Sequence, residues 1–228
     1  MSHFSQFENV GFASGFGGTH IARTMMLDEL TTLLDQVDDS NALPEDYASA
    51  ILEDNCLGKR SDRARKLSWR HLQSLYAFDP EAPLFRALRY FWRRDEAGHP
   101  LLALLCAYAR DAVLQKSAPF ILGLKEGATI TRQDTEDFFD AEAPDRFSKA
   151  TLKSVSQNIN GTWTRSGHLT GHVRKMRTRP RPTAGSVAYA LFLGYLTDAR
   201  GEGLFHSPFV NILDCSVDEA IELAESAS

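Results

Sequence analysis

One stretch of the chain, residues 146–197, contains no aspartate or glutamate over 52 residues, although the protein as a whole has a formal net charge of −5. Its lysine and arginine side chains therefore have no acidic neighbours in sequence with which to pair. Unpaired cations raise the local positive potential, so they favour positions that solvent or an anionic partner can reach. The stretch is predicted to present a basic surface, and the phosphate backbone of a nucleic acid is the counterpart that such a surface fits.

The net charge averages over regions of opposite sign. Residues 59–94 carry ten Lys and Arg against three acidic residues, a net charge of +7, and residues 146–197 carry nine against none, a net charge of +9. All other residues together carry a net charge of −21. The chain is thus acidic with two basic blocks, and these blocks indicate nucleic-acid binding although the overall pI is only about 5.8.

The length of 228 residues allows one large domain or two small ones, and 43% hydrophobic residues are typical of a globular protein. Three widely separated cysteines, Cys56, Cys106 and Cys215, form neither a disulfide framework nor a zinc pattern. No secretory signal pattern opens the sequence, so we expect a cytoplasmic protein. The two most hydrophobic stretches, 101–124 and 184–196, are predicted to be buried helices: the first carries charges and the second is too short to span a membrane.

The predicted fold is mainly α, with two helix-turn-helix or winged-helix-like units around a long central helix and a short β-wing in the second unit. Residues 1–20 show no helical or strand period and are predicted to be an N-terminal arm that orders only against the body or a partner. Residues 21–125 are predicted to form a helical, helix-turn-helix-like domain. Residues 126–228 are predicted to form a winged helix-turn-helix-like domain that ends in an acidic helix over 217–227.

In the first unit, hydrophobic spacing predicts helices over residues 21–37, 44–54 and 62–76, and Ser61 is the expected N-cap of the third. Two helices, a turn and a basic helix are the order of a helix-turn-helix, whose last helix lies in the DNA major groove. A solvated surface helix in an ordinary bundle is the alternative. A further helix from Pro83 is expected to extend the basic surface. The residues predicted to contact nucleic acid here are Lys59, Arg60, Arg63, Lys66, Arg70, Gln73, Arg86, Arg89 and Arg93.

Residues 101–124 are predicted to be the central helix, bent near Pro119. His71 and Asp111 lie on otherwise hydrophobic helix faces. We expect both to be hydrogen-bonded interior residues and not catalytic groups.

In the second unit, the pattern predicts a strand over 128–131, a helix through Phe139, a helix over 148–163, and strands over 168–170 and 173–177 around Gly171. The helix over 148–163 buries one hydrophobic stripe and presents Lys, Gln and Asn on its other side, a composition typical of a recognition helix. The strand pair is then the wing, which contacts the minor groove or the backbone. The residues predicted to contact nucleic acid here are Lys149, Lys153, Gln157, Asn160, Arg165, His168, Arg174, Lys175, Arg177, Arg179 and Arg181.

An enzymatic site needs a nucleophile with a base, paired carboxylates, or metal ligands at a known spacing. The sequence contains no such set. His168 and His172 are four residues apart, but Gly167 and Gly171 argue against the helix that would bring their rings together, so no metal site is expected. We therefore expect a binding protein without catalytic residues, cofactor or metal.

Four segments resemble the BrxA family, a small component of BREX bacteriophage-defence systems: residues 57–66 (LGKRSDRARK), 85–92, 101–114 and above all 147–171 (FSKATLKSVSQNINGTWTRSGHLTG). The resemblance spans roughly residues 51–196. It implies a non-enzymatic, mainly helical protein that binds double-stranded DNA and works beside a methyltransferase and other BREX proteins. An older structural comparison for that family is an RNA-binding antitermination factor of the NusB kind. RNA therefore stays an alternative ligand, and a scaffold that docks acidic proteins stays an alternative role.

Overall fold

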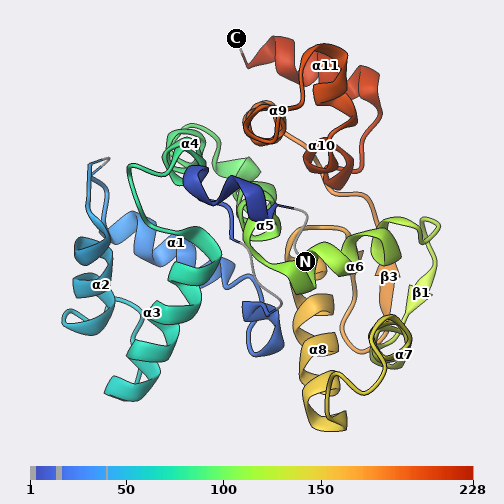
Figure 1. Cartoon of the computed structure of the whole chain (residues 1–228), viewed down its shortest axis with the longest axis horizontal. Coiled ribbons are helices and arrows are strands. Elements are labelled where there is room, and N and C mark those ends of the chain that lie inside the picture. The colour runs from blue at the N-terminus through green and yellow to red at the C-terminus, as the bar shows by residue number, and fades with distance from the viewer. Residues whose placement is uncertain (1–3, 14–16, 40, 228) are drawn as a thin grey trace.

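The computed structural model describes residues 4–13, 17–39 and 41–227. The fold is mainly helical with a small three-stranded antiparallel sheet, as predicted (Figure 1). The α-helices are α1 (Leu27–Gln36), α2 (Pro44–Leu52), α3 (Asp62–Tyr76), α4 (Pro83–Trp92), α5 (His99–Arg110), α6 (Ala112–Leu122), α7 (Arg132–Glu142), α8 (Lys149–Arg165), α9 (Ala184–Leu196), α10 (Pro208–Ile212) and α11 (Val217–Ser226). The strands are β1 (Thr129–Ile130), β2 (Leu169–Thr170) and β3 (Lys175–Arg177), and 3₁₀ helices cover η1 (Ser5–Val10), η2 (Thr19–Ile21), η3 (Glu96–Gly98) and η4 (Gly201–His206).

Helices α1, α2 and α3 follow one another in the order predicted for a helix-turn-helix. α2 packs against both α1 and α3. α3 has the predicted bounds because Ser61 caps it: the Ser61 hydroxyl oxygen accepts the N–H of Ala64 at 3.2 Å. α3 buries Leu72 and Leu75, leaves Arg63, Lys66 and Arg70 exposed, and partly buries Arg65.

Helix α1 begins at Leu27 and not at Ile21, where the spacing predicts its start. Hydrogen bonds to distant elements hold the preceding residues out of a helix. The N–H of Met25 donates to the Thr162 hydroxyl of α8 at 2.9 Å, and the Tyr76 hydroxyl of α3 donates to the Met25 carbonyl. Both partners are distant in sequence, so the local spacing of hydrophobic residues cannot predict these contacts.

The predicted central helix is in fact two helices, α5 and α6, which meet at Asp111. The break lies at Asp111 and not near Pro119, which lies within α6. Asp111 has extended backbone angles (φ −126°, ψ 107°), and its carboxylate accepts the N–H groups of Val113 at 2.9 Å and Leu114 at 3.0 Å. The side chain is therefore the N-cap that starts α6. α5 still occupies the centre of the molecule, where it packs against α3, α4, α6 and α9.

A buried polar cluster joins the N-terminal segment, the α5–α6 junction and α8. His20 Nδ1 lies 2.9 Å from Asp111 Oδ2, and His20 Nε2 lies 2.9 Å from Thr162 Oγ1. The Asn158 side chain donates to the His20 carbonyl at 3.1 Å. The backbone approaches Asp111 so closely at Gly18 that a Cβ there would lie 2.2 Å from Oδ1, so only glycine fits.

The carboxyl group of Asp111 has a lowered pKa. Burial by itself raises it, but the facing His20 and the backbone N–H groups of Leu114 and His20 outweigh burial. Asp111 is thus the hydrogen-bonded interior residue that the sequence predicts. His71, for which the same was expected, is only half-buried.

The predicted N-terminal arm packs on the body over its described residues. Phe4 and Phe12 are buried, and their rings lie 5.1 and 5.9 Å from the ring of Phe209 in α10. The ring of Phe4 also lies 6.0 Å from that of Tyr108 in α5. The aromatic side chains of this segment therefore belong to the core.

The second unit contains β1, α7, α8, β2 and β3 in the order predicted for a winged helix-turn-helix. The sheet order is β1-β3-β2, with Thr129 opposite Met176 and Leu169 opposite Arg177. Gly171 makes the turn between β2 and β3 with a φ of 97°. The hydroxyl oxygen of Ser148 accepts the N–H of Thr151 at 3.2 Å and so begins α8, which packs against α7.

The C-terminal helices pack on α9, whose bounds are those predicted. α11 ends within one residue of the predicted acidic helix. The sequence pattern does not predict α10 or η4. α10 has only five residues, too few to show a helical period, and it is fixed by its Ser207 cap and by the burial of Phe209.

His168 is fully buried where β2 meets α10. His168 Nε2 lies 2.8 Å from the Ile212 carbonyl, and Nδ1 lies 2.9 Å from the Ser166 hydroxyl. A carbonyl can only accept, so Nε2 carries the proton and the neutral ring satisfies both partners. Burial lowers the pKa of His168 to about 3.

Because the folded protein keeps His168 neutral while the unfolded chain protonates it below about pH 6.5, the free energy of unfolding should fall as pH falls through this range. The expected contribution between pH 6.5 and 4.5 is at most about 1.4 kcal/mol per pH unit. Urea unfolding of the wild type and of His168→Gln over this range measures it. The variant should be less stable at pH 7.5 and show the shallower slope. Equal slopes would contradict a neutral, buried His168. Burial also lowers the pKa of the half-buried His71, but His71 is present in both proteins, so its contribution cancels in the comparison.

Candidate nucleic-acid interface

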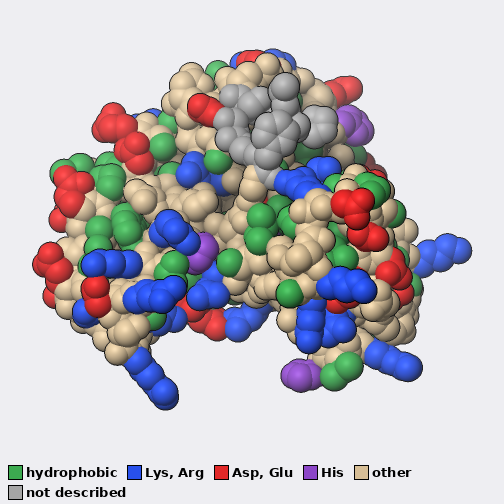
Figure 2. Space-filling view, turned by 60° about the horizontal axis from the view of Figure 1, so that its bottom comes forward, with side chains coloured by type: hydrophobic (Ala, Val, Ile, Leu, Met, Phe, Trp, Pro, Cys, Tyr) green, Lys and Arg blue, Asp and Glu red, His purple; other side chains and the backbone are tan. Residues whose placement is uncertain are grey.

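Helices α3 and α8 both extend from the centre of the molecule toward the lower edge of Figure 1, one from each unit. Figure 2 turns this edge toward the viewer and shows Lys and Arg side chains on both sides of a hollow between the two units. The two helices predicted to recognise nucleic acid thus flank one face. We call this face the α3–α8 face.

On the α3 side, the cations differ in how far they are engaged within the protein. Arg60, Arg63 and Arg70 are exposed. Lys66 is 68% exposed and lies 2.8 Å from Asp62 on the first turn of its own helix, a pair that solvent weakens. Lys59 is partly buried and pairs with Glu29 at 3.1 Å. Four of the five predicted cations on this side can therefore reach a ligand without losing a buried contact.

On the α8 side, Lys149, Lys153 and Gln157 are exposed and spaced four apart on one face of the helix, and Arg165 at the end of the helix is exposed but paired with Asp28. The side of α8 that carries Val155, Ile159 and Trp163 is anchored in the core. Trp163 is fully buried, and its indole N–H donates to the Ser117 hydroxyl of α6 at 2.9 Å. The anchor fixes the rotation of α8, so the exposed face is presented to solvent in one orientation.

The wing lies beside α8. Arg174 is exposed at its tip, and a hollow of about 350 Å³ lies among Gln157 and Gly161 of α8, Arg132 of α7, and His172, Val173 and Lys175 of the wing. Lys175 is half-buried, its ammonium group donates to the Gly171 carbonyl at 3.0 Å, and burial lowers its pKa. Val173 is 80% exposed, so the wing tip offers a hydrophobic contact as well as a cation.

Four predicted site residues are buried, and their assignment to the interface is corrected. Arg89 donates to the carbonyls of Leu34 and Val37 at the end of α1. The other three are Asn160, bonded to Thr135; His168, bonded to Ile212; and Arg177, which donates to the Ile121 carbonyl and pairs with Asp214 at 2.7 Å. Each satisfies buried polar groups, so none is free to contact a duplex.

Other predicted cations are exposed but lie elsewhere or are paired. α4 lies in the upper left part of Figure 1, away from the lower ends of α3 and α8, so this helix does not extend the α3–α8 face with Arg86 and Arg93 as predicted. Arg93 also pairs with Asp38 at 2.7 Å. Arg165 pairs with Asp28, and Arg179 lies 3.6 Å from Glu126. Arg181 is exposed in the connection from β3 to α9.

Sequence reasoning missed two cations. Arg23 is exposed between η2 and α1, close enough to His71 of α3 to help lower the pKa of that imidazole, after the larger effect of burial. It lies outside both basic blocks, so charge counting could not find it. Arg132 begins α7 beside the wing hollow, where it pairs with Glu136 at 2.6 Å.

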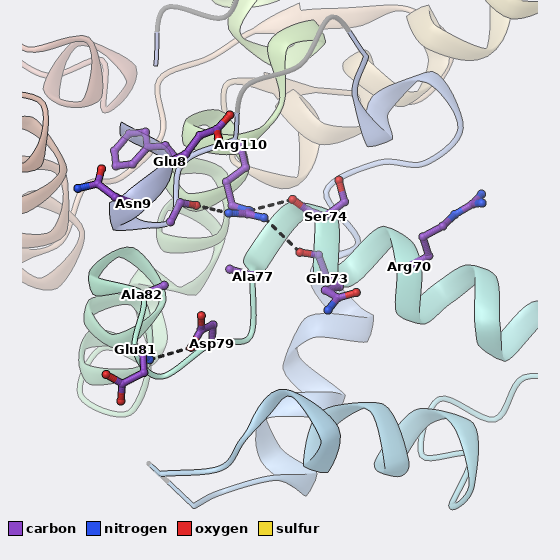
Figure 3. Close-up of a pocket in the computed structure, with 12 residues that line it drawn as sticks. Glu8, Asn9, Arg70, Gln73, Ser74, Ala77, Asp79, Glu81, Ala82 and Arg110 are labelled. Atoms are coloured by element: carbon purple, nitrogen blue, oxygen red, sulfur yellow. Dashed lines mark hydrogen bonds between the residues drawn. The ribbon is translucent and has the colours of Figure 1, made fainter. Parts of the chain in front are cut away.

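A larger hollow of about 610 Å³ lies between η1 and the C-terminal end of α3 (Figure 3). Arg110 lies within it and donates to the carbonyls of Gly11, Gln73 and Ser74, so its guanidinium joins the N-terminal segment to α3. Glu8, Asp79 and Glu81 also line this hollow, and so does Arg70 of α3. Gln73, predicted to contact nucleic acid, lines it as well, and there three carboxylates oppose the positive charges of Arg70 and Arg110.

Among the described residues, no group of three or more His, Cys, Asp or Glu side chains is placed to hold a metal ion. Within the same part of the chain, no helix is both long and hydrophobic enough to cross a bilayer. The free thiols do not form a reactive site either: burial raises the pKa of Cys106 to about 12 and that of Cys215 to about 11.

No protein-family model and no curated protein matches the chain.

Proposed function

We propose that the protein binds double-stranded DNA with little sequence preference, using α3, α8 and the wing on one face. The observation that carries the proposal is the position of α3 and α8 on two sides of a hollow, each with exposed cations toward the same face (Figure 2). A duplex carries charge on both strands, so two basic projections from one body can contact its backbone at separate places. The residues outside the two basic blocks carry a net charge of −21, and this negative charge disfavours most other orientations of a duplex on the protein.

α8 is the helix that we assign to the major groove. Its exposed side offers Lys149 and Lys153 to phosphates and Gln157 to a base edge or a phosphate. Arg174 and Val173 of the wing lie beside it and suit the minor groove or the sugar-phosphate backbone. On the other projection, Arg60, Arg63 and Arg70 contribute phosphate contacts, and Arg23 adds a cation between the two units.

RNA is the competing ligand. Proteins that bind single-stranded RNA stack bases on exposed aromatic rings. The aromatic rings of α3 and α8 are not available for this: Trp163 is fully buried, and Trp69 is partly buried and stacks on Phe78 at 5.7 Å. A helix in a groove suits the B-form major groove. The arrangement therefore supports duplex DNA over single-stranded RNA.

The biological setting that we propose rests on the resemblance to the BrxA family. It makes the chain a non-enzymatic, cytoplasmic accessory component of a BREX-type phage-defence system that acts with other BREX proteins. The exposed acidic side of α11, with Asp218, Glu219 and Glu222, is a surface on which such a partner could dock. A scaffold role without DNA is separated from this proposal by pull-down of partners after nuclease treatment.

Affinity for a duplex should fall steeply with salt, because phosphate contacts release condensed counterions. If about six to ten phosphates are contacted, the association constant should fall by roughly 10³ to 10⁵ between 50 and 200 mM salt. The combined change Arg60→Gln, Arg63→Gln and Arg70→Gln should lower the slope of log K against log salt by about 2.7, since each phosphate contact contributes about 0.9. Gel shifts and fluorescence anisotropy with a 30-base-pair duplex measure both. A flat salt dependence would end the proposal, and an unchanged slope in the variant would exclude α3.

Reversal of three charges on the second unit should abolish measurable binding. We expect Lys149→Glu, Lys153→Glu and Arg174→Glu together to weaken duplex affinity by roughly 100-fold or more, because three attractions become repulsions. The matched control, Arg86→Glu with Arg94→Glu and Arg200→Glu, changes the net charge equally but lies on or just after α4 and after α9, away from the α3–α8 face, and should retain affinity within about tenfold. Circular dichroism and urea midpoints check that both variants fold. Equal losses in the two variants would mean that net charge alone, and not this face, drives binding.

A further inference from the structure

A second basic surface lies on α4, at the far side of the molecule from the α3–α8 face (Figure 1). It surrounds a hollow of about 260 Å³ lined by Pro80, Phe85, Arg86, Arg89, Tyr90, Arg93 and Arg94. Four of the seven lining residues are arginines and none is acidic. We call it the α4 hollow. Its volume is below the roughly 300–1,000 Å³ of sites for drug-sized ligands, so it suits one compact chemical group.

Arg89 is the fixed part of this site. Only 5% of its side chain is exposed, and its two terminal nitrogens donate to the Leu34 carbonyl at 3.2 Å and the Val37 carbonyl at 2.8 Å. Its Nε is buried and has no hydrogen-bond acceptor among the described residues. Burial lowers the pKa of Arg89, and Arg93 lowers it further, while Tyr47, Asp38 and Asp35 offset part of this effect. The fold therefore buries the positive charge of Arg89 where negative groups of the protein offset it only in part.

Asp38 is the carboxylate that pairs directly with these arginines, and Asp35 adds a second negative charge near Arg89. Asp38 lies 2.7 Å from Arg93 and 4.0 Å from Arg89, and it is itself 80% exposed. Arg94 lies over the ring of Tyr90 at 3.8 Å and donates to the Tyr90 carbonyl at 3.0 Å, which orients it without neutralising it. Arg86 is exposed. Among the described residues, four cations thus lie near two carboxylates, of which Asp38 pairs with them directly and Asp35 acts on Arg89 through its charge.

The charge balance selects among anions. A lone carboxylate would add one negative charge to a site that already contains Asp38. A phosphate monoester carries about −1.5 to −2 charges at pH 7 and three acceptor oxygens, which matches several arginines better. A duplex backbone supplies phosphodiesters, and its expected position is on the other side of the molecule.

We propose that the α4 hollow binds the phosphate monoester group of a small molecule such as a nucleotide or a sugar phosphate. Arg86 and Arg94 bind the phosphate oxygens directly, and Arg93 contributes the donors that Asp38 leaves free. Arg89 supplies a fixed positive charge beneath them. The site is separate from duplex binding, so the protein can hold a small phosphorylated ligand and DNA at the same time.

The test is binding of defined probes to the full chain by isothermal titration calorimetry and thermal unfolding at constant ionic strength. Adenosine 5′-monophosphate, glucose 6-phosphate and inorganic phosphate are compared with adenosine and acetate. Binding of the three phosphate probes without binding of adenosine or acetate supports the site. Binding of adenosine 5′-monophosphate and of no other probe supports the site with a nucleotide as its ligand. Equal binding of acetate, or of adenosine, would overturn the phosphate assignment. No binding of any phosphate probe would overturn the site.

Variants locate the site and separate it from the DNA interface. Arg86→Gln with Arg94→Gln should weaken phosphate binding by roughly tenfold or more, since each removes a charged hydrogen bond. Arg63→Gln with Arg70→Gln, a matched pair on α3, should change it less than twofold. The charge reversal at Lys149, Lys153 and Arg174 should abolish duplex binding and leave phosphate binding intact. Loss of phosphate binding in the α3 pair or in the charge-reversal variant, or its survival in the α4 pair, would overturn the location. Arg89 is not substituted, because its removal would leave the Leu34 and Val37 carbonyls at the end of α1 without their hydrogen-bond donor.

Discussion

The buried contact between Asp111 and His20 is the interaction on which the arrangement of the two units depends. The Asp111 carboxylate lies where α5 ends and caps α6. It also lies 2.9 Å from Nδ1 of His20, whose Nε2 lies 2.9 Å from the Thr162 hydroxyl of α8. The Thr162 hydroxyl also accepts the N–H of Met25, which directs the chain into α1. One cluster therefore sets the start of α6, the entry to the first unit and the position of α8. Because a buried carboxylate without partners is costly, these elements are stable only together.

This coupling bears on the candidate interface, because it fixes two cationic helices relative to each other. α3 is tied to the same segment by the hydroxyl of Tyr76, which donates to the Met25 carbonyl. α8 is held by Thr162 and by the burial of Trp163. A pair of helices on flexible tethers would lose conformational entropy on binding one duplex, whereas a pair held by shared buried contacts has already lost it on folding. Preorganisation of this kind favours affinity without requiring base-specific contacts.

The arginines of this protein serve two different purposes, and only burial distinguishes them. Arg89, Arg110 and Arg177 donate to backbone carbonyls at the ends of α1, α3 and α6. In that position each satisfies acceptors that the helix leaves unpaired. Arg63, Lys149 and Arg174 are exposed to solvent. Charge along the sequence is the same in both groups, so counting cations overestimates the interface and also misses Arg23, which stands alone among acidic residues.

Most of the helices can be predicted from the order of the amino acids alone. The bounds of α3 and α9, the caps Ser61 and Ser148, the wing turn at Gly171 and the exposed stripe of Lys149, Lys153 and Gln157 all follow from local spacing and local hydrogen bonds. Other features depend on tertiary contacts, which local spacing cannot indicate. The break at Asp111, the late start of α1, the docking of Phe4 and Phe12, and the burial of Asn160, His168 and Arg177 all depend on partners distant in sequence. The physical reason is that a helix is stabilised by neighbours three and four residues away, whereas a buried polar group takes whichever partner the fold brings to it.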